Sequence, residues 1–203
     1  LTATVGPKIE NYYMLAATPS VYKPGALKAF KLGGHSSAFG ASTSTGAGLK
    51  YEADNGFATS FTVNSKGASS TNGLLTNLDE NKVNTMVAYT ADRYHLSATY
   101  SKQHNGWDAW SYFSTSDVAS DTAIDGADAV ALRGWWRPAE TGTAIPSISV
   151  GYDMIDFEGH NIAEYATGYM VGLNWQDSFI PDDRIGLAMG SALSIKGHVY
   201  DPT

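Results

Sequence analysis

The chain has 203 residues, which fits one domain or part of one, and its lack of cysteine excludes disulfide cross-links and thiolate metal sites. The net charge of -7 argues against a general nucleic-acid-binding protein. No run reaches the about 18–20 consecutive apolar residues of a membrane helix. Charged residues are only 16%, against ~25% in ordinary soluble domains, and aromatic residues reach 12%. Such a composition suits a protein with one surface in lipid and another in water.

The chain opens with a strand-like run, LTATVG, which is followed by a segment unlike the rest, residues 6–46. This segment holds four lysines against one acid, although the chain as a whole is acidic. It also carries several aromatic side chains and no sustained periodicity, so we expect a long loop.

Strict alternation begins after this segment. In GAGLKYEA, the residues Ala47, Leu49 and Tyr51 share one face, while Lys50 and Glu52 share the other. Period two predicts a strand with one apolar and one polar face. GFATSFTVNSK repeats the pattern, and the intervening Asp-Asn-Gly favours a tight hairpin turn because these residues tolerate positive φ.

Three further pairs of runs show the same alternation. The runs are VNTMVAYT and RYHLSATYS, then AVALRGWW and SISVGYDM, then GYMVGLNW and RIGLAMG. Together with the opening run and the first pair, they predict about nine strands. Most of these runs are ~8–10 residues long, as a tilted strand across the hydrocarbon layer of a membrane requires.

The predicted connections alternate in length along the chain. Short ones lie near 54–55, 91–92, 138–146 and 176–183, and long ones near 6–46, 65–82, 103–128 and 155–166. Aromatic residues flank the short connections. This is the pattern of an all-β, antiparallel up-and-down transmembrane barrel with short periplasmic turns, long extracellular loops and aromatic girdles. Because single-chain bacterial barrels use an even number of strands, we expect residues 1–203 to form part of one larger barrel domain.

Several segments, in this order, resemble the cyanobacterial outer-membrane porins, which are related to the OprB-type carbohydrate-selective porins. The segments are TVGPKIENYYML with PSVY, GAGL at 46–49, VAYTADRYHLSATYS, and DSFIPDDRIGLAMG. The resemblance implies a homotrimeric porin in the cell outer membrane. It also implies an N-terminal S-layer-homology domain that binds peptidoglycan, which this chain does not contain, and solutes that are small inorganic ions, iron among them.

The barrel prediction gives the long segment a role, because a loop folded into a barrel narrows the pore and its charges set selectivity. The alternative is that its lysines lie on an outer surface or form salt bridges. Its aromatic residues either contact sugars or only pack the loop against the strands. The predicted constriction residues are Lys8, Glu10, Lys23, Lys28 and Lys31, the aromatic residues of the loop are Tyr12, Tyr13, Tyr22 and Phe30, and the predicted pore-wall residues are Lys50, Glu52, His95, Arg133 and Asp153.

No catalytic or metal-binding pattern is present: the five histidines lie in different segments without HExxH spacing, and no GxSxG motif occurs. We therefore expect neither an enzyme nor a cofactor. The predicted function is a passive diffusion channel, with carbohydrate as the alternative solute. The rival functions are a soluble or surface β-sandwich that binds a partner through its loops, and a structural barrel with little conductance.

Overall fold

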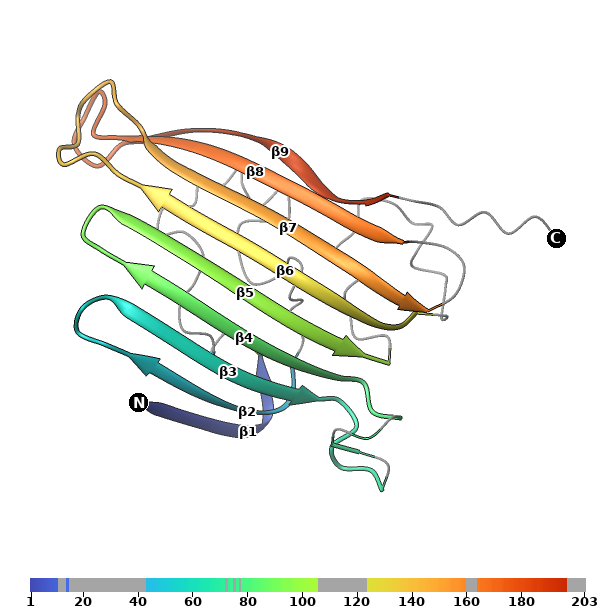
Figure 1. The fold of residues 1–203 in the computed structure, drawn as a ribbon. Helices are drawn as coiled ribbons and strands as arrows, with labels where there is room; N and C mark the ends of the chain where they lie inside the picture. The colour runs from blue at the N-terminus through green and yellow to red at the C-terminus, as the bar shows by residue number, and fades with distance from the viewer. Residues whose placement is uncertain are drawn as a thin grey trace.

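The computed structural model describes residues 1–10, 14, 43–71, 73–74, 76, 78–105, 124–159 and 164–196. These residues form nine strands in one antiparallel sheet whose spatial order follows the chain (Figure 1). The all-β, up-and-down prediction is therefore confirmed. The strands are β1 Thr2–Glu10, β2 Thr43–Glu52, β3 Phe57–Ser65, β4 Asn81–Thr90, β5 Tyr94–His104, β6 Ile124–Trp136, β7 Ser147–Gly159, β8 Tyr165–Gln176 and β9 Arg184–Lys196.

The sheet is open. Each strand pairs with its neighbours in sequence, and β1 and β9 form the two edges, so the described strands do not close into a barrel. No helix in the described part of the chain is long and apolar enough to span a bilayer.

The four short connections, residues 53–56, 91–93, 137–146 and 177–183, lie at one end of the sheet, which we call the short-turn rim (Figure 1). Backbone hydrogen bonds join neighbouring turns along this rim. Thr90 N–H donates to Gly56 O at 2.9 Å, and Arg137 N–H donates to Arg93 O at 2.9 Å. The rim is therefore continuous from β2 to β7.

The hairpin between β2 and β3 turns where the Asp-Asn-Gly motif predicts. Ala53 N–H donates to Phe57 O at 2.8 Å, and Gly56 N–H donates to Ala53 O at 3.1 Å. Asn55 Oδ1 accepts a hydrogen bond from Phe57 N–H at 3.1 Å. Gly56 has φ of +89°, a conformation that L side chains rarely adopt.

Substituting Gly56→Ala is expected to lower the free energy of unfolding by about 1–3 kcal/mol. The added methyl group is strained by the positive φ and would also collide with the Thr90 carbonyl oxygen, which belongs to the next hairpin. Gly142→Ala is the control, since φ is +71° there but the nearest atom is 3.2 Å from the added carbon. Denaturant titration of both variants separates strain from collision. Equal losses of unfolding free energy for the two variants would show that the close contact with Thr90 does not contribute to the effect.

The four connections at the opposite end are all shorter than predicted, as two of them illustrate. Residues 6–46 were expected to form one loop, but β1 continues to Glu10 and β2 begins at Thr43, which leaves 11–42. The β1–β2 ladder resumes beyond Gly6 after a register shift, with Ile9 opposite Ser44. Likewise, β7 and β8 extend into the predicted long connection 155–166 and leave only 160–164. Ladder pairing there continues because each strand has a partner, although the hydrophobic alternation fades.

The two faces of the sheet differ in chemistry and in exposure. The large apolar side chains project to one face, which we call the apolar face, and they are exposed. They include Leu49, Tyr51, Phe57, Phe61, Val87, Tyr89, Tyr94, Leu96, Tyr100, Val130, Leu132, Trp136, Ile148, Val150, Tyr152, Met154, Tyr169, Ile185, Leu187 and Met189. The opposite face is mostly buried, and we call it the polar face, although it also carries buried apolar side chains such as Met86, Ile155 and Met170. Its buried polar side chains include Thr62, Asn64, Lys82, Asn84, His95, Ser97, Thr99, Ser101, Arg133, Ser149 and Asp153.

A charged cluster ends the apolar face at the side away from the short-turn rim. Lys102 Nζ lies 3.0 Å from Asp128 Oδ2 and also pairs with Glu158. The Tyr100 hydroxyl donates to Asp128. The apolar residues of β5 therefore run from Tyr94, at the rim, to Tyr100, beside the charges.

Candidate functional site

All five predicted pore-wall residues lie on the polar face, but in different surroundings. Lys50 and Glu52 follow each other on that face of β2, next to the short-turn rim. Lys50 Nζ lies 3.3 Å from Glu52 Oε2, and both side chains are partly exposed. His95, Arg133 and Asp153 are buried. The structure thus separates an accessible ion pair from a buried group.

Arg133 and Asp153 form a buried ion pair between β6 and β7. The register places Arg133 opposite Gly151 and Ala131 opposite Asp153, so the two side chains are diagonal neighbours. Arg133 Nη2 donates to Asp153 Oδ2 at 3.0 Å, and Nη1 donates to Asp153 Oδ1, which makes the pair bidentate. A β-carbon at position 151 would lie 3.2 Å from Arg133 Cδ, so glycine leaves room for the arginine.

His95 belongs to an aromatic stack beside the short-turn rim. Its ring is parallel to Trp135, with centroids 6.1 Å apart, and the guanidinium of Arg137 lies 5.9 Å from the Trp135 ring. His95 Nδ1 shares a hydrogen bond of 2.8 Å with Thr90 Oγ1. This contact orients the imidazole, whose second nitrogen, Nε2, is buried without a hydrogen-bond partner among the described residues.

Sequence reasoning missed Lys82, which is fully buried on the polar face. The predicted strand began at Val83, so Lys82 was assigned to the preceding connection. The structure starts β4 at Asn81 and sets Lys82 opposite Asn64 and Gln103. Extending the alternation back from Asn84 would have placed this lysine on the polar face.

Asparagine side chains cross-link the polar face between strands. Asn64 Nδ2 donates to Ser44 Oγ at 3.2 Å, and Asn84 Nδ2 donates to Thr62 Oγ1 at 2.9 Å. Other buried polar atoms on this face have no hydrogen-bond partner among the described residues. They are Asn64 Oδ1, Asn84 Oδ1, His95 Nε2, Ser97 Oγ and Ser101 Oγ. Since buried polar atoms in folded proteins are almost always satisfied by protein or water, we expect ordered water molecules at these atoms.

The structure describes few residues of the predicted constriction. Lys8 and Glu10 lie in β1 and not in the loop. The other predicted residues of this segment lie outside the described residues: Lys23, Lys28, Lys31, Tyr12, Tyr13, Tyr22 and Phe30. Met14 is described: it is buried, and β-carbons built at Gly46 and Gly48 would lie 3.1 and 2.9 Å from its side chain. One residue of the β1–β2 connection therefore packs on the polar face.

Among the described residues, no group of three or more His, Asp or Glu side chains could hold a metal ion. The arrangement offers charges, amides and hydroxyls on one face of the sheet, interspersed with apolar side chains such as Met86 and Ile155, and the polar groups suit the passage or binding of polar solutes. Comparisons with protein-family models, curated proteins and solved structures find no match, so the resemblance to porins stays a prediction from the sequence.

Proposed function

We propose that this sheet is part of an outer-membrane β-barrel through which small solutes diffuse passively. The apolar face contacts lipid, and the polar face turns to the interior of the barrel, where its accessible part, such as Lys50 and Glu52, borders a water-filled passage. The observation that carries the proposal is the inverted polarity of the sheet: Asp153 is 0% exposed on one face, while Leu96 is 61% exposed on the other. Transmembrane barrels alternate in this sense, apolar outside and polar inside.

The apolar face would be energetically unfavourable in water. Fully burying one large apolar side chain stabilises a protein by about 1.5–3 kcal/mol, and exposed apolar patches beyond a few hundred Å² are rare on soluble monomers. Here such side chains are exposed on every strand from β2 to β9. Lipid removes this surface from water, and the strand lengths of 9 to 13 residues are sufficient for tilted strands to cross the hydrocarbon layer.

The open edges support a larger barrel. In hydrocarbon, each unsatisfied backbone N–H or C=O costs several kcal/mol, so a spanning sheet needs a partner at both edges. We propose that further strands pair with β1 and β9 and complete the barrel. The short-turn rim then faces the periplasm, and the connections at the opposite end face outward.

The polar face argues against the soluble β-sandwich. A sandwich buries the apolar faces of two sheets against each other. Here the polar face is mostly buried, and no described residue covers the apolar face. The solute class rests on the resemblance alone: small inorganic ions, iron among them, with carbohydrate as the alternative, through a homotrimer.

Reconstitution of the purified protein into planar lipid bilayers tests the channel. We expect stepwise conductance increments and a requirement for detergent or lipid during purification. A monodisperse protein in buffer without detergent would refute the membrane location. Insertion into the bilayer without conductance would contradict the channel and support the structural barrel instead.

Replacing Lys8 of β1 and the predicted constriction residues Lys23, Lys28 and Lys31 together by glutamine is expected to reduce anion preference, because cationic side chains along a pore attract anions. The measurement is the reversal potential in a salt gradient. Lys102→Gln is the control: it removes a positive charge from the apolar face, outside the proposed passage, and is expected to leave the reversal potential unchanged. Equal reversal potentials for the wild type and the quadruple variant would contradict the constriction.

A further inference from the structure

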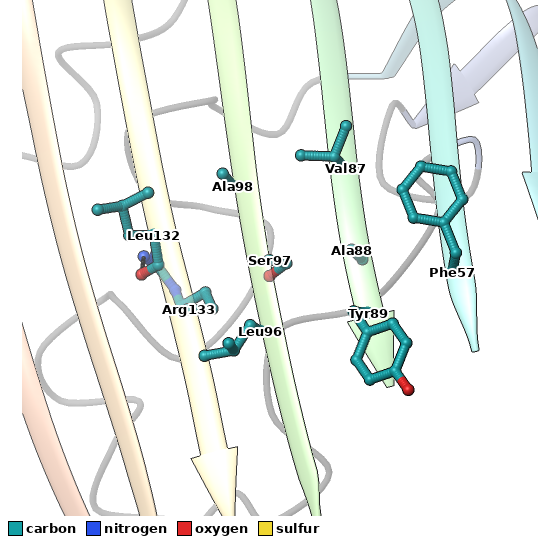
Figure 2. Close-up of a pocket in the computed structure, with 9 residues that line it drawn as sticks. All are labelled: Phe57, Val87, Ala88, Tyr89, Leu96, Ser97, Ala98, Leu132 and Arg133. Carbon is teal, nitrogen blue, oxygen red and sulfur yellow. Dashed lines mark hydrogen bonds between the residues drawn. The ribbon is translucent and has the colours of Figure 1, made fainter. Parts of the chain in front are cut away.

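A shallow depression of about 440 Å³ interrupts the apolar face near the short-turn rim (Figure 2). Its apolar lining comprises Phe57, Val87, Tyr89, Leu96, Ala98 and Leu132. The register sets Ala98 between Val87 and Leu132, so a small side chain lies between two larger ones. Figure 2 shows the larger side chains around Ala98, with the Tyr89 hydroxyl aimed toward the end of β4. The depression is therefore an apolar groove that leads toward the rim.

A second, polar pocket of about 590 Å³ adjoins the groove at the rim and shares Tyr89 with it. It is built from two hairpin turns and the end of β6. The charged groups of its lining are Asp54, Asp92 and Arg93, and its aromatic groups are Tyr89, Tyr94 and Trp136. The rings of Tyr89 and Tyr94 lie 5.8 Å apart. An apolar groove thus opens directly into a polar pocket that contains both signs of charge.

The charges of the pocket point to one class of headgroup. Arg93 is exposed and forms no ion pair among the described residues, and a guanidinium binds phosphate with two parallel hydrogen bonds. The two carboxylates beside it suit a group that carries a positive charge next to the phosphate. A primary ammonium donates hydrogen bonds to carboxylates and is attracted to an aromatic face such as that of Trp136.

We propose that the groove and the pocket together bind one phosphatidylethanolamine molecule. An acyl chain occupies the groove over Ala98, Arg93 binds the phosphate, and Asp54, Asp92 and Trp136 surround the ammonium. A phosphatidylglycerol headgroup carries no ammonium, so nothing in it would offset the charges of the two carboxylates. A choline headgroup has no N–H to donate. The proposal rests on the proposed membrane location of the sheet.

Native mass spectrometry of the full chain in detergent tests this site, with phosphatidylethanolamine, phosphatidylglycerol and phosphatidylcholine of equal chain length as probes. We expect one retained phosphatidylethanolamine, bound more tightly than either competitor. Arg93→Gln is expected to weaken it about tenfold, the effect of one charge-assisted hydrogen bond. The double variant Asp54→Asn with Asp92→Asn is expected to lose the preference for phosphatidylethanolamine over phosphatidylglycerol. Ala98→Phe fills the groove and weakens all three lipids.

Arg184→Gln is the matched control, since Arg184 is an exposed arginine at the same rim, at the start of β9, and lines neither cavity. Equal retention of the three lipids, or equal losses for Arg93→Gln and Arg184→Gln, would overturn the site. Bilayer conductance of the same preparations separates the two proposals. A conducting protein without lipid preference refutes only the lipid site, whereas a protein that never enters bilayers refutes both.

Discussion

Leu96→Arg is expected to lower the free energy of unfolding in lipid by about 1–4 kcal/mol, because a charged side chain on the lipid face of a barrel costs about 2–4 kcal/mol at the bilayer midplane and less toward the interface. Leu96 lies between Tyr94 and Tyr100, which bound the apolar run of β5. The arginine would have to leave hydrocarbon or bring water into it. Equilibrium denaturation of the protein reconstituted in vesicles gives the measurement.

Ile145→Arg provides a control with nearly the same exposure, since Ile145 is 57% exposed and Leu96 is 61% exposed. Ile145 lies in the turn 137–146, at the short-turn rim and outside the strands. There the substitution is expected to change stability by no more than about 0.5 kcal/mol. If the apolar face were in contact with water, both substitutions would change the free energy of unfolding by similarly small amounts. Similar values for the two variants would therefore exclude the lipid contact.

Asp153→Ala is expected to cost about 3–5 kcal/mol, because it leaves the guanidinium of Arg133 buried without its carboxylate. Both side chains of the pair are almost fully buried, and the pair is bidentate. Replacing both partners by apolar residues, as in Arg133→Met with Asp153→Leu, is expected to cost far less, since no charge remains to be desolvated. Denaturation of Arg133→Met, of Asp153→Leu and of the double variant completes the cycle, with Asp153→Ala measured beside them.

Lys50→Gln is the comparison for this cycle, because the Lys50–Glu52 pair lies on the same polar face but is partly exposed. A pair of this kind contributes about 0–1 kcal/mol. Should Asp153→Ala cost as little as Lys50→Gln, the Arg133–Asp153 pair would be solvated by the passage, and its role would be electrostatic and not structural.

The faces and turns of the strands follow from local sequence. Alternation sorts Leu49 and Tyr51 from Lys50 and Glu52 because successive side chains of any strand point to opposite faces. The Asp-Asn-Gly turn is equally local, since Gly56 must adopt positive φ. The boundaries were less accurate: β6 starts at Ile124 and β7 ends at Gly159, beyond the alternating runs. Ladder hydrogen bonds with a neighbouring strand extend these elements, and no local pattern reports them.

The sequence by itself therefore determined an all-β chain of two-faced strands, their order along the chain and the residues on each face. Only the tertiary structure decided which side chains meet across strands. Arg133 and Asp153 are neighbours because the β6–β7 register places them diagonally, and a shift of one residue would send Asp153 to the apolar face. It also buried Lys82, joined the rim into one line of hydrogen bonds, and set the groove over Ala98 beside the pocket of Arg93. These contacts depend on strand register and curvature, which are properties of the assembled sheet and of no single segment.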